Sequence, residues 1–242
     1  MSVKKAFGQI VWVQPLTLLD YPGKLAALVF FGGCNLRCPF CYNAELVLPE
    51  LLENLSPLSL EEVLNQLAER VGFLDGVVIT GGEPTLSPSL PDFVRRLKNL
   101  GFLVKLDTNG TNPAVLADLL ATGLLDYVAL DFKAPLARYG EYTGLAEAGR
   151  VVEAVCRSFQ LIAEKAPDYE VRTTVAPGLT AQDLLQIAQE ISGAKRYVLQ
   201  PFFAPPKKRL VEESWRRPAL NATELKRILP ELQRFVPTEI RG

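Results

Sequence analysis

Six short apolar runs recur along this 242-residue chain, and each is followed by a stretch with polar residues or helical spacing. Such runs predict buried strands. The expected strands cover residues 26–31, 76–80, 102–106, 127–130, 169–175 and 196–199. Apolar strands that alternate with helices are typical of a parallel sheet in an α/β fold. Six units would wrap most of the way round a barrel, and periodicity alone leaves an open doubly wound sheet as the alternative.

Turn and capping residues predict where the helices lie. Ser59 is a suitable N-cap for a helix to about residue 71, and Asn112 precedes a helix that begins at Pro113 and ends at Gly123. Further helices are expected over residues 88–100, 146–165 and 181–191. We expect one domain over residues 1–242, with a core at about 17–201 and an irregular C-terminal extension at about 203–242.

Three cysteines lie within eight residues, at Cys34, Cys38 and Cys41, and the chain has no histidine. Cysteine thiolates bind iron–sulfur clusters, and three ligands on a four-iron cluster leave one iron open to an outside molecule. A structural zinc site would need a fourth N or S ligand, and disulfides belong to small, cysteine-dense, secreted chains. A redox pair of Cys38 and Cys41 would leave Cys34 unexplained. We expect an iron–sulfur cluster here, and the distant Cys156 receives no role.

Polar residues follow four of the expected strands. Cys34 comes after the first strand, Glu83 after the second, Asp107 after the third and Asp131 after the fourth. In a barrel and in a doubly wound sheet alike, functional groups gather at the C-terminal ends of the strands. The sequence therefore predicts one site at this edge of the sheet.

Charge and hydropathy exclude several function classes. The formal net charge is −1, and basic and acidic residues are interspersed, unlike the basic patch of a nucleic-acid binder. The longest apolar stretch, residues 25–31, is too short to span a bilayer, and no secretory signal is visible. We expect a cytoplasmic protein that binds neither nucleic acid nor membrane.

Two motifs carry a family resemblance. Residues 33–43, Gly-Cys-Asn-Leu-Arg-Cys-Pro-Phe-Cys-Tyr-Asn, resemble the cluster motif of the radical S-adenosylmethionine (SAM) superfamily, and residues 80–84, Thr-Gly-Gly-Glu-Pro, resemble its glycine-rich second motif. The resemblance implies a 4Fe-4S cluster on Cys34, Cys38 and Cys41 that chelates the methionyl amino and carboxylate groups of SAM. It also implies one-electron cleavage of SAM to a 5′-deoxyadenosyl radical, which abstracts a hydrogen atom.

Within that superfamily the chain most resembles the glycyl-radical enzyme activases, and among them the activator of anaerobic (class III) ribonucleotide reductase. Residues 18–24, 41–46, 107–110 and 130–133 carry this resemblance. It implies a partial (β/α)6 barrel, open on one side to a glycine loop of the partner protein. It further implies a low-potential electron donor such as flavodoxin or ferredoxin.

The resemblance also implies roles for single residues near the cluster. The carbonyls of Gly81 and Gly82 would face the methionyl ammonium of SAM. Glu83 would orient the strand end, with a carboxylate at a helix N-terminus as the simpler interpretation. Phe40 would contact the adenine, or serve as a core aromatic residue.

Further roles follow at the ends of later strands. Asp107 would bind the SAM ribose or a monovalent cation, with Thr108 and Asp131 as further groups of that cation site. Lys133 would pair with the SAM carboxylate, and Asn109 belongs to the same SAM-binding motif. Arg172 lies on the fifth expected strand, and the sequence does not determine whether its side chain faces this site. Gln200 stands near where the pyruvate formate-lyase activator carries a histidine.

Two other functions remain as alternatives. A radical SAM enzyme acting on a small molecule, such as 7-carboxy-7-deazaguanine synthase, shares the hexad at residues 33–38. A non-catalytic iron–sulfur or zinc protein that only binds a partner is the third possibility.

Overall fold

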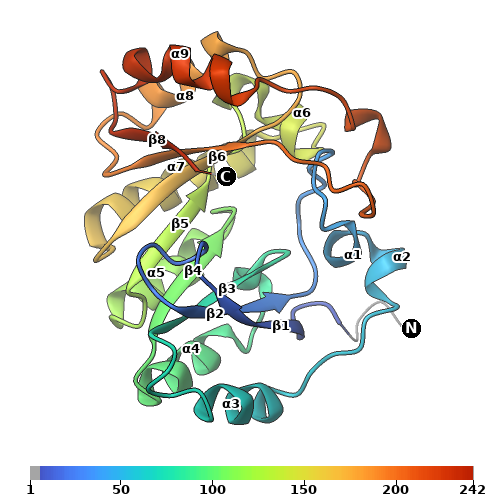
Figure 1. The fold of residues 1–242 in the computed structure, drawn as a ribbon, viewed down its shortest axis with the longest axis vertical. Helices are drawn as coiled ribbons and strands as arrows, with labels where there is room; N and C mark the ends of the chain where they lie inside the picture. The colour runs from blue at the N-terminus through green and yellow to red at the C-terminus, as the bar shows by residue number, and fades with distance from the viewer. Residues whose placement is uncertain (1–5, 242) are drawn as a thin grey trace.

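The computed structural model describes residues 6–241 and contains one eight-stranded sheet (Figure 1). The strands follow one another in sequence order across the sheet, β1 to β8. Strands β2 to β8 are parallel, and β1 runs antiparallel to β2. Their bounds are β1 (Ile10–Thr17), β2 (Ala26–Phe31), β3 (Gly76–Gly81), β4 (Leu103–Thr108), β5 (Tyr127–Asp131), β6 (Tyr169–Val175), β7 (Tyr197–Pro201) and β8 (Thr238–Ile240).

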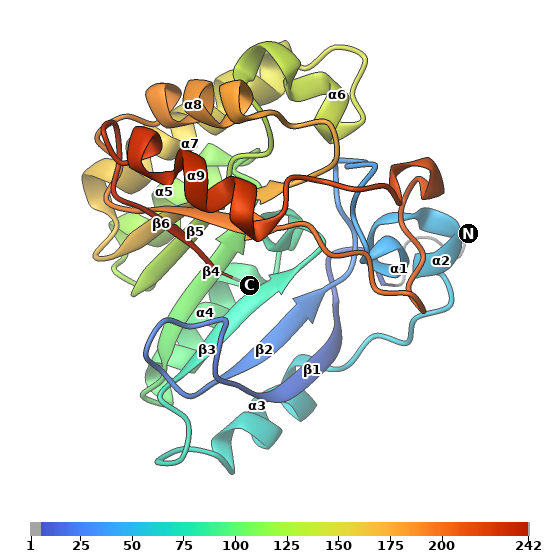
Figure 2. The ribbon, with the colours of Figure 1, turned by 45° about the horizontal axis from the view of Figure 1, so that its top comes forward.

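The sheet is a partial barrel. A doubly wound sheet reverses its strand order at a switch point, whereas here the order never reverses. Among the described residues no pairing joins β1 to β8, so these two strands are the edges of the sheet. The helices lie along its outer side, as the two views show (Figure 2). The α/β barrel-like fold that the sequence predicted is therefore confirmed, and the doubly wound alternative is wrong.

The connecting helices lie close to where the sequence placed them. Ser59 caps α3 through a complete capping box with Glu62. Asn112 precedes α5 but makes no side-chain cap bond, since its amide instead donates to the carbonyl oxygen of Thr85 at 2.9 Å. The helices are α1 (Ala44–Val47), α2 (Pro49–Leu52), α3 (Leu60–Ala68), η1 (Pro84–Leu86), α4 (Leu90–Asn99), α5 (Pro113–Ala121), η2 (Leu136–Arg138), α6 (Tyr139–Thr143), α7 (Gly149–Lys165), α8 (Ala181–Glu190), η3 (Glu213–Trp215) and α9 (Ala222–Leu232).

The C-terminal extension is only partly irregular, which corrects the expectation for residues 203–242. Irregular chain with one short 3₁₀ turn runs to Asn221, which then caps α9 with a capping box. Leu225 and Leu232 on α9 are fully buried, and β8 pairs in parallel with β7. These residues are ordered because they bury apolar side chains against the barrel and satisfy the free edge of β7.

The barrel interior is apolar on one side and charged on the other. Tyr21, Leu28 and Val78 form an apolar cluster toward β2 and β3. Charged side chains from β4, β5 and β6 occupy the opposite side, including the fully buried Lys105. Within residues 6–241 the helices are all too short or too polar to cross a bilayer.

Candidate active site

A cavity of about 410 Å³ opens at the C-terminal ends of the strands. Every residue that the sequence singled out for cluster or SAM binding lines it. They are Cys34, Cys38, Phe40, Cys41, Gly81, Gly82, Glu83, Asp107, Thr108, Asn109, Asp131 and Lys133, and Arg172 and Gln200 line it too. The fold thus brings the ends of β2 to β7 to one pocket, as parallel strands do.

The cysteine loop leaves β2 and turns back under the pocket. Cys38 is buried, and Cys34 and Cys41 are half-buried. The N–H of Cys41 donates to the carbonyl oxygen of Cys38 at 3.0 Å, which closes a tight turn between the two thiols. Burial raises the pKa of the Cys34 thiol to about 11 and that of Cys38 to about 12. Ligand formation therefore has to remove protons from these thiols.

A C-terminal strap, defined here as residues 203–217, crosses the cysteine loop. The N–H of Val211 donates to the carbonyl oxygen of Cys41, and the N–H of Glu212 donates to that of Pro39, each at 3.0 Å. The Trp215 ring lies 6.1 Å from the Phe40 ring, measured between centroids. The strap therefore fixes the backbone on either side of the last cysteine.

Gly81 and Gly82 carry the end of β3 against the cysteine loop. A Cβ on Gly82 would lie 2.0 Å from the carbonyl oxygen of Gly33, and one on Gly81 would lie 2.3 Å from that of Phe31. Gly81 also has φ +125°, which side chains disfavour. Both positions therefore require glycine, because the end of β3 passes so close to the backbone of Phe31 and Gly33.

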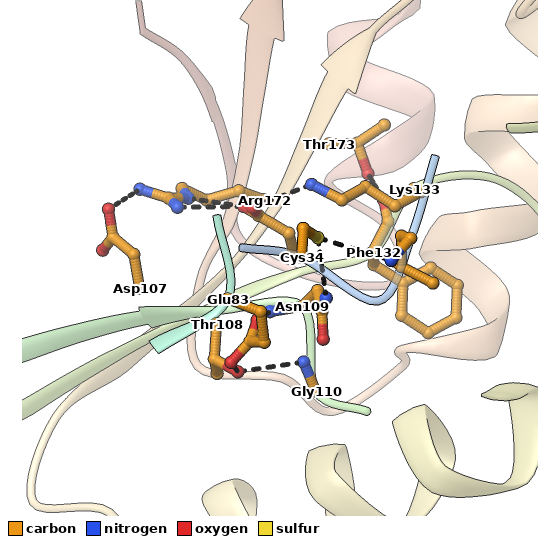
Figure 3. A network of polar contacts seen from close by, with 12 residues as sticks. Cys34, Glu83, Asp107, Thr108, Asn109, Gly110, Phe132, Lys133, Arg172 and Thr173 are labelled. Carbon is orange, nitrogen blue, oxygen red and sulfur yellow. Dashed lines mark hydrogen bonds and ion pairs between the residues drawn. The ribbon is translucent and has the colours of Figure 1, made fainter. Parts of the chain in front are cut away.

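Glu83 is a buried brace between β3 and β4. Its carboxylate accepts hydrogen bonds from the Thr85 N–H and hydroxyl, at 3.1 and 2.6 Å. From the end of β4 it accepts the Thr108 hydroxyl at 2.8 Å and the Asn109 N–H at 2.7 Å. It therefore caps the η1 turn and holds the strand ends, where Figure 3 shows it beside Thr108 and Asn109.

Five charged residues form a continuous chain of ion pairs beside the pocket. Figure 3 shows Arg172 of this chain between Asp107 and Lys133. Lys105 pairs with Asp107 Oδ1, and Arg172 Nη1 lies 3.1 Å from Asp107 Oδ2. Arg172 also contacts Asp131 Oδ1 at 2.9 Å, and Lys133 Nζ lies 2.9 Å from Asp131 Oδ2. Burial alone would raise the pKa of Asp131, but Arg172 and Lys133 outweigh it and hold that pKa well below its usual range.

Asn109 and Phe40 both line the pocket, yet each makes a firm contact with the protein. Asn109 Nδ2 donates to Asn35 Oδ1 at 3.1 Å and points at Cys34 Sγ from 3.8 Å. Such contacts to a ligand sulfur orient it and tune its electronics. Phe40 is 5% exposed and packs against both Tyr142 and Trp215. It is a core aromatic residue that also lines the pocket.

Comparison with known proteins identifies the family. The profile of the radical SAM superfamily matches residues 28–191. The chain belongs to the radical SAM superfamily. It is 34% identical, over 219 residues, to a proposed glycyl-radical enzyme activating enzyme of Methanocaldococcus jannaschii, covering 89% of this chain and 88% of that protein. It is therefore an enzyme of the radical SAM type.

Two other relatives are informative. A 7-carboxy-7-deazaguanine synthase of Hyperthermus butylicus is 39% identical over 119 residues, about half of either chain, at 49% and 46%. Among solved structures, Streptococcus suis SuiB bound to S-adenosylmethionine superposes with a TM-score of 0.66 at 12% identity. That alignment covers 89% of this chain and 52% of SuiB, and it supports the fold alone.

The residues present fit the 4Fe-4S cluster that a radical SAM family member implies. Three thiols line the pocket, while Cys156 lies on α7 and is not among the lining residues. Within residues 6–241, no three cysteine, aspartate or glutamate side chains converge as the ligands of a single ion would. This does not argue against a cluster, because each thiolate would bind a different iron atom and the three thiols need not meet at one point.

Sequence reasoning left two site residues unassigned or undecided. Arg172 faces the pocket and joins Asp107 to Asp131, which settles the direction that the sequence left open. Lys105 was hidden inside an apolar strand. Its spacing of two from Asp107 is the signal that could have placed both side chains on one face of β4.

Proposed function

We propose that this radical SAM enzyme is an activase that abstracts a hydrogen atom from a glycine of a partner protein. The observation that carries the proposal is the relative from Methanocaldococcus jannaschii, which is named for this activity and matches almost end to end. Anaerobic ribonucleotide reductase is the partner we propose, on the resemblance at residues 18–24. Flavodoxin or ferredoxin is the proposed electron donor.

In this proposal the pocket residues bind and orient the substrate. Cys34, Cys38 and Cys41 would hold the cluster, which when bound supplies the electron for cleaving SAM. Lys133 and Cys38 line the same pocket, and the positive charge of Lys133 suits the carboxylate of SAM. Lys133 would then interact with both that carboxylate and Asp131. The Asp131 carboxylate retains lone pairs for a ribose hydroxyl.

Exposed apolar side chains support a protein as the second substrate. Trp12, Leu16, Leu18 and Leu19 are exposed on β1 and the turn after it, with Leu18 at 66% and Leu19 at 79%. Asp20 of the same turn lines the pocket. An apolar surface that continues into an active-site pocket is typical of a place where a protein partner binds.

A small-molecule substrate is the second candidate, favoured by the identity with the Hyperthermus butylicus synthase over half of the chain. An anaerobic electron paramagnetic resonance (EPR) measurement separates the two. The sample contains reconstituted protein, reductant, SAM and the class III reductase of the same organism. We expect a persistent glycyl-radical doublet. Formation of 5′-deoxyadenosine without that doublet would contradict the proposed partner and favour another substrate.

A further inference from the structure

The residues at the expected cation site do not fit a monovalent cation. Each oxygen of the two carboxylates already has a cationic partner in the protein. Asp107 meets Lys105 and Arg172, and Asp131 meets Arg172 and Lys133. An alkali-metal ion bound to these oxygens would lie beside their cationic partners and be repelled by them.

Thr108, the third expected ligand, is turned away from the two carboxylates. Its hydroxyl donates to Glu83 at 2.8 Å and accepts the Gly110 N–H at 3.1 Å. Successive residues of a strand point to opposite faces, so the side chains of Thr108 and Asp107 diverge from β4. The three groups therefore do not form one site.

Lys105 is held firmly where it neutralises Asp107. Its side chain is 0% exposed, and Asp107 is its ion-pair partner. Burial lowers the pKa of Lys105 and the Asp107 carboxylate opposes this. The pair as a unit has no net charge, so Asp107 is neutralised from within the protein.

The net charge of the five residues in this ion-pair chain also disfavours an added cation. Three cationic side chains, Lys105, Arg172 and Lys133, face two carboxylates, which leaves one net positive charge. We infer that Lys105 and Arg172 supply from within the protein the positive charge at this site, which therefore takes no alkali-metal ion. This inference goes beyond the proposed function, because it concerns the ion requirement of SAM binding and cleavage and not the identity of the partner.

The first test uses the unaltered holoenzyme. SAM cleavage to 5′-deoxyadenosine is measured with KCl, NaCl or tetramethylammonium chloride at matched ionic strength, because general screening also affects charged sites. We expect rates that agree within about twofold across the three salts, a difference below about 0.5 kcal/mol. Thallium(I) NMR gives a second readout that needs no activity, and we expect no binding that KCl displaces. Saturable stimulation by K⁺ or Na⁺, or displaceable thallium binding, would overturn the inference.

The second test removes the internal cation. Lys105→Met keeps the length of the side chain but frees Asp107 Oδ1, so this variant should acquire displaceable thallium binding and a rate that KCl raises about tenfold (about 1.4 kcal/mol). Lys98→Met is the matched control, since Lys98 pairs with Asp126 at 2.6 Å and neither residue lines this pocket. A Lys105→Met variant that folds yet responds to no cation would contradict the role of Lys105. If it does not fold, the salt comparison on the unaltered holoenzyme still decides.

The two proposals fail in different ways. Absence of SAM cleavage in every salt would count against the radical SAM activity, while the thallium measurement would still report on the ion. Cation-independent cleavage without a glycyl radical would count against the proposed partner alone.

Discussion

The N–H of Val211 donates a hydrogen bond to the carbonyl oxygen of Cys41, so the strap contacts the backbone of a cysteine far away in the sequence. Trp215 extends this contact, with its ring 5.3 Å from that of Tyr142 and 6.1 Å from that of Phe40. Aromatic pairs of this kind contribute about 0.5–1.5 kcal/mol beyond the area they bury. The strap is thus part of the cluster-binding structure.

Removing the Trp215 ring should therefore loosen the cysteine loop. We expect Trp215→Ala to lower the free energy of unfolding by about 2 kcal/mol, less than for a fully buried tryptophan, and to speed cluster loss to an iron chelator. The decay of the cluster absorbance measures this. Trp12→Ala is the control, because Trp12 is 52% exposed and lies on β1, away from the strap. Equal rates of cluster loss in both variants would show that the strap does not support the loop.

The three clustered cysteines should be separable from the fourth. Cys34→Ala, Cys38→Ala and Cys41→Ala should each abolish cluster incorporation, since a lost thiolate removes one of three ligands. Cys156→Ala should retain the cluster, because Cys156 lies outside the pocket. Iron and sulfide content after anaerobic reconstitution, together with the EPR spectrum of the reduced protein, measures both. Loss of the cluster in Cys156→Ala would refute the ligand assignment.

The crossing of β3 and the cysteine loop should not tolerate a methyl group. In Gly82→Ala the added Cβ would meet the Gly33 carbonyl oxygen at 2.0 Å, so we expect a loss of about 3 kcal/mol in stability. Gly149→Ala, at the start of α7 with no atom within 4 Å of its added Cβ, should be neutral or slightly stabilising. Chemical denaturation of the two variants compares them directly. A Gly82→Ala variant as stable as the native protein would mean that the crossing opens readily.

Acid should weaken the fold partly through Asp131. The pKa of Asp131 is lower in the folded protein than in the unfolded chain. The ionised carboxylate therefore stabilises the fold above a pH of about 4, and this stabilisation is lost as the pH falls further. Asp131→Asn should therefore be less stable at neutral pH, by about 3 kcal/mol or more, yet lose less stability between about pH 5 and pH 3.

Unfolding curves across that pH range measure the two slopes. Asp92→Asn removes a carboxylate whose side chain is 55% exposed, and it should keep the acid slope of the native protein. If the Asp131→Asn and native curves run parallel, Asp131 does not carry this pH dependence.

The apolar turn after β1 offers a test of the protein partner. Replacing both Leu18 and Leu19 by serine should leave SAM cleavage unchanged but lower the glycyl-radical yield on the reductase about tenfold, as for a modest interface contact. Phe73→Ser is the matched control, because Phe73 is 58% exposed and does not line the pocket. A double variant that forms the glycyl radical at the native rate would exclude this turn from the interface.

The sequence predicted the parallel strands and their polar ends because local signals specify them. An apolar run ending in glycine places β2 and β3, and Ser59 with Glu62 determines the start of α3. The two edge strands carry weaker signals. β1 contains Pro15, which argues against a central strand but is tolerated at an edge, and β8 has only three residues.

The pairing of Arg172 with Asp107 and Asp131 could not be predicted, because it depends on contacts across strands. Nothing local to Arg172 says that it lies between Asp107 and Asp131, which come from two other strands. Likewise α9 has Pro230 within it, and its order derives from the burial of Leu225 and Leu232 against the barrel. Contacts of both kinds can be identified only once the fold is known.

The contact between Val211 and Cys41 has a consequence for biosynthesis. Val211 is translated 170 residues after Cys41. Until residues 203–217 have been synthesised, the cysteine loop lacks the two backbone hydrogen bonds that the strap supplies. Once the strap is in place, the same loop is braced from outside. The brace on the cysteine loop can therefore form only long after the loop itself has been synthesised.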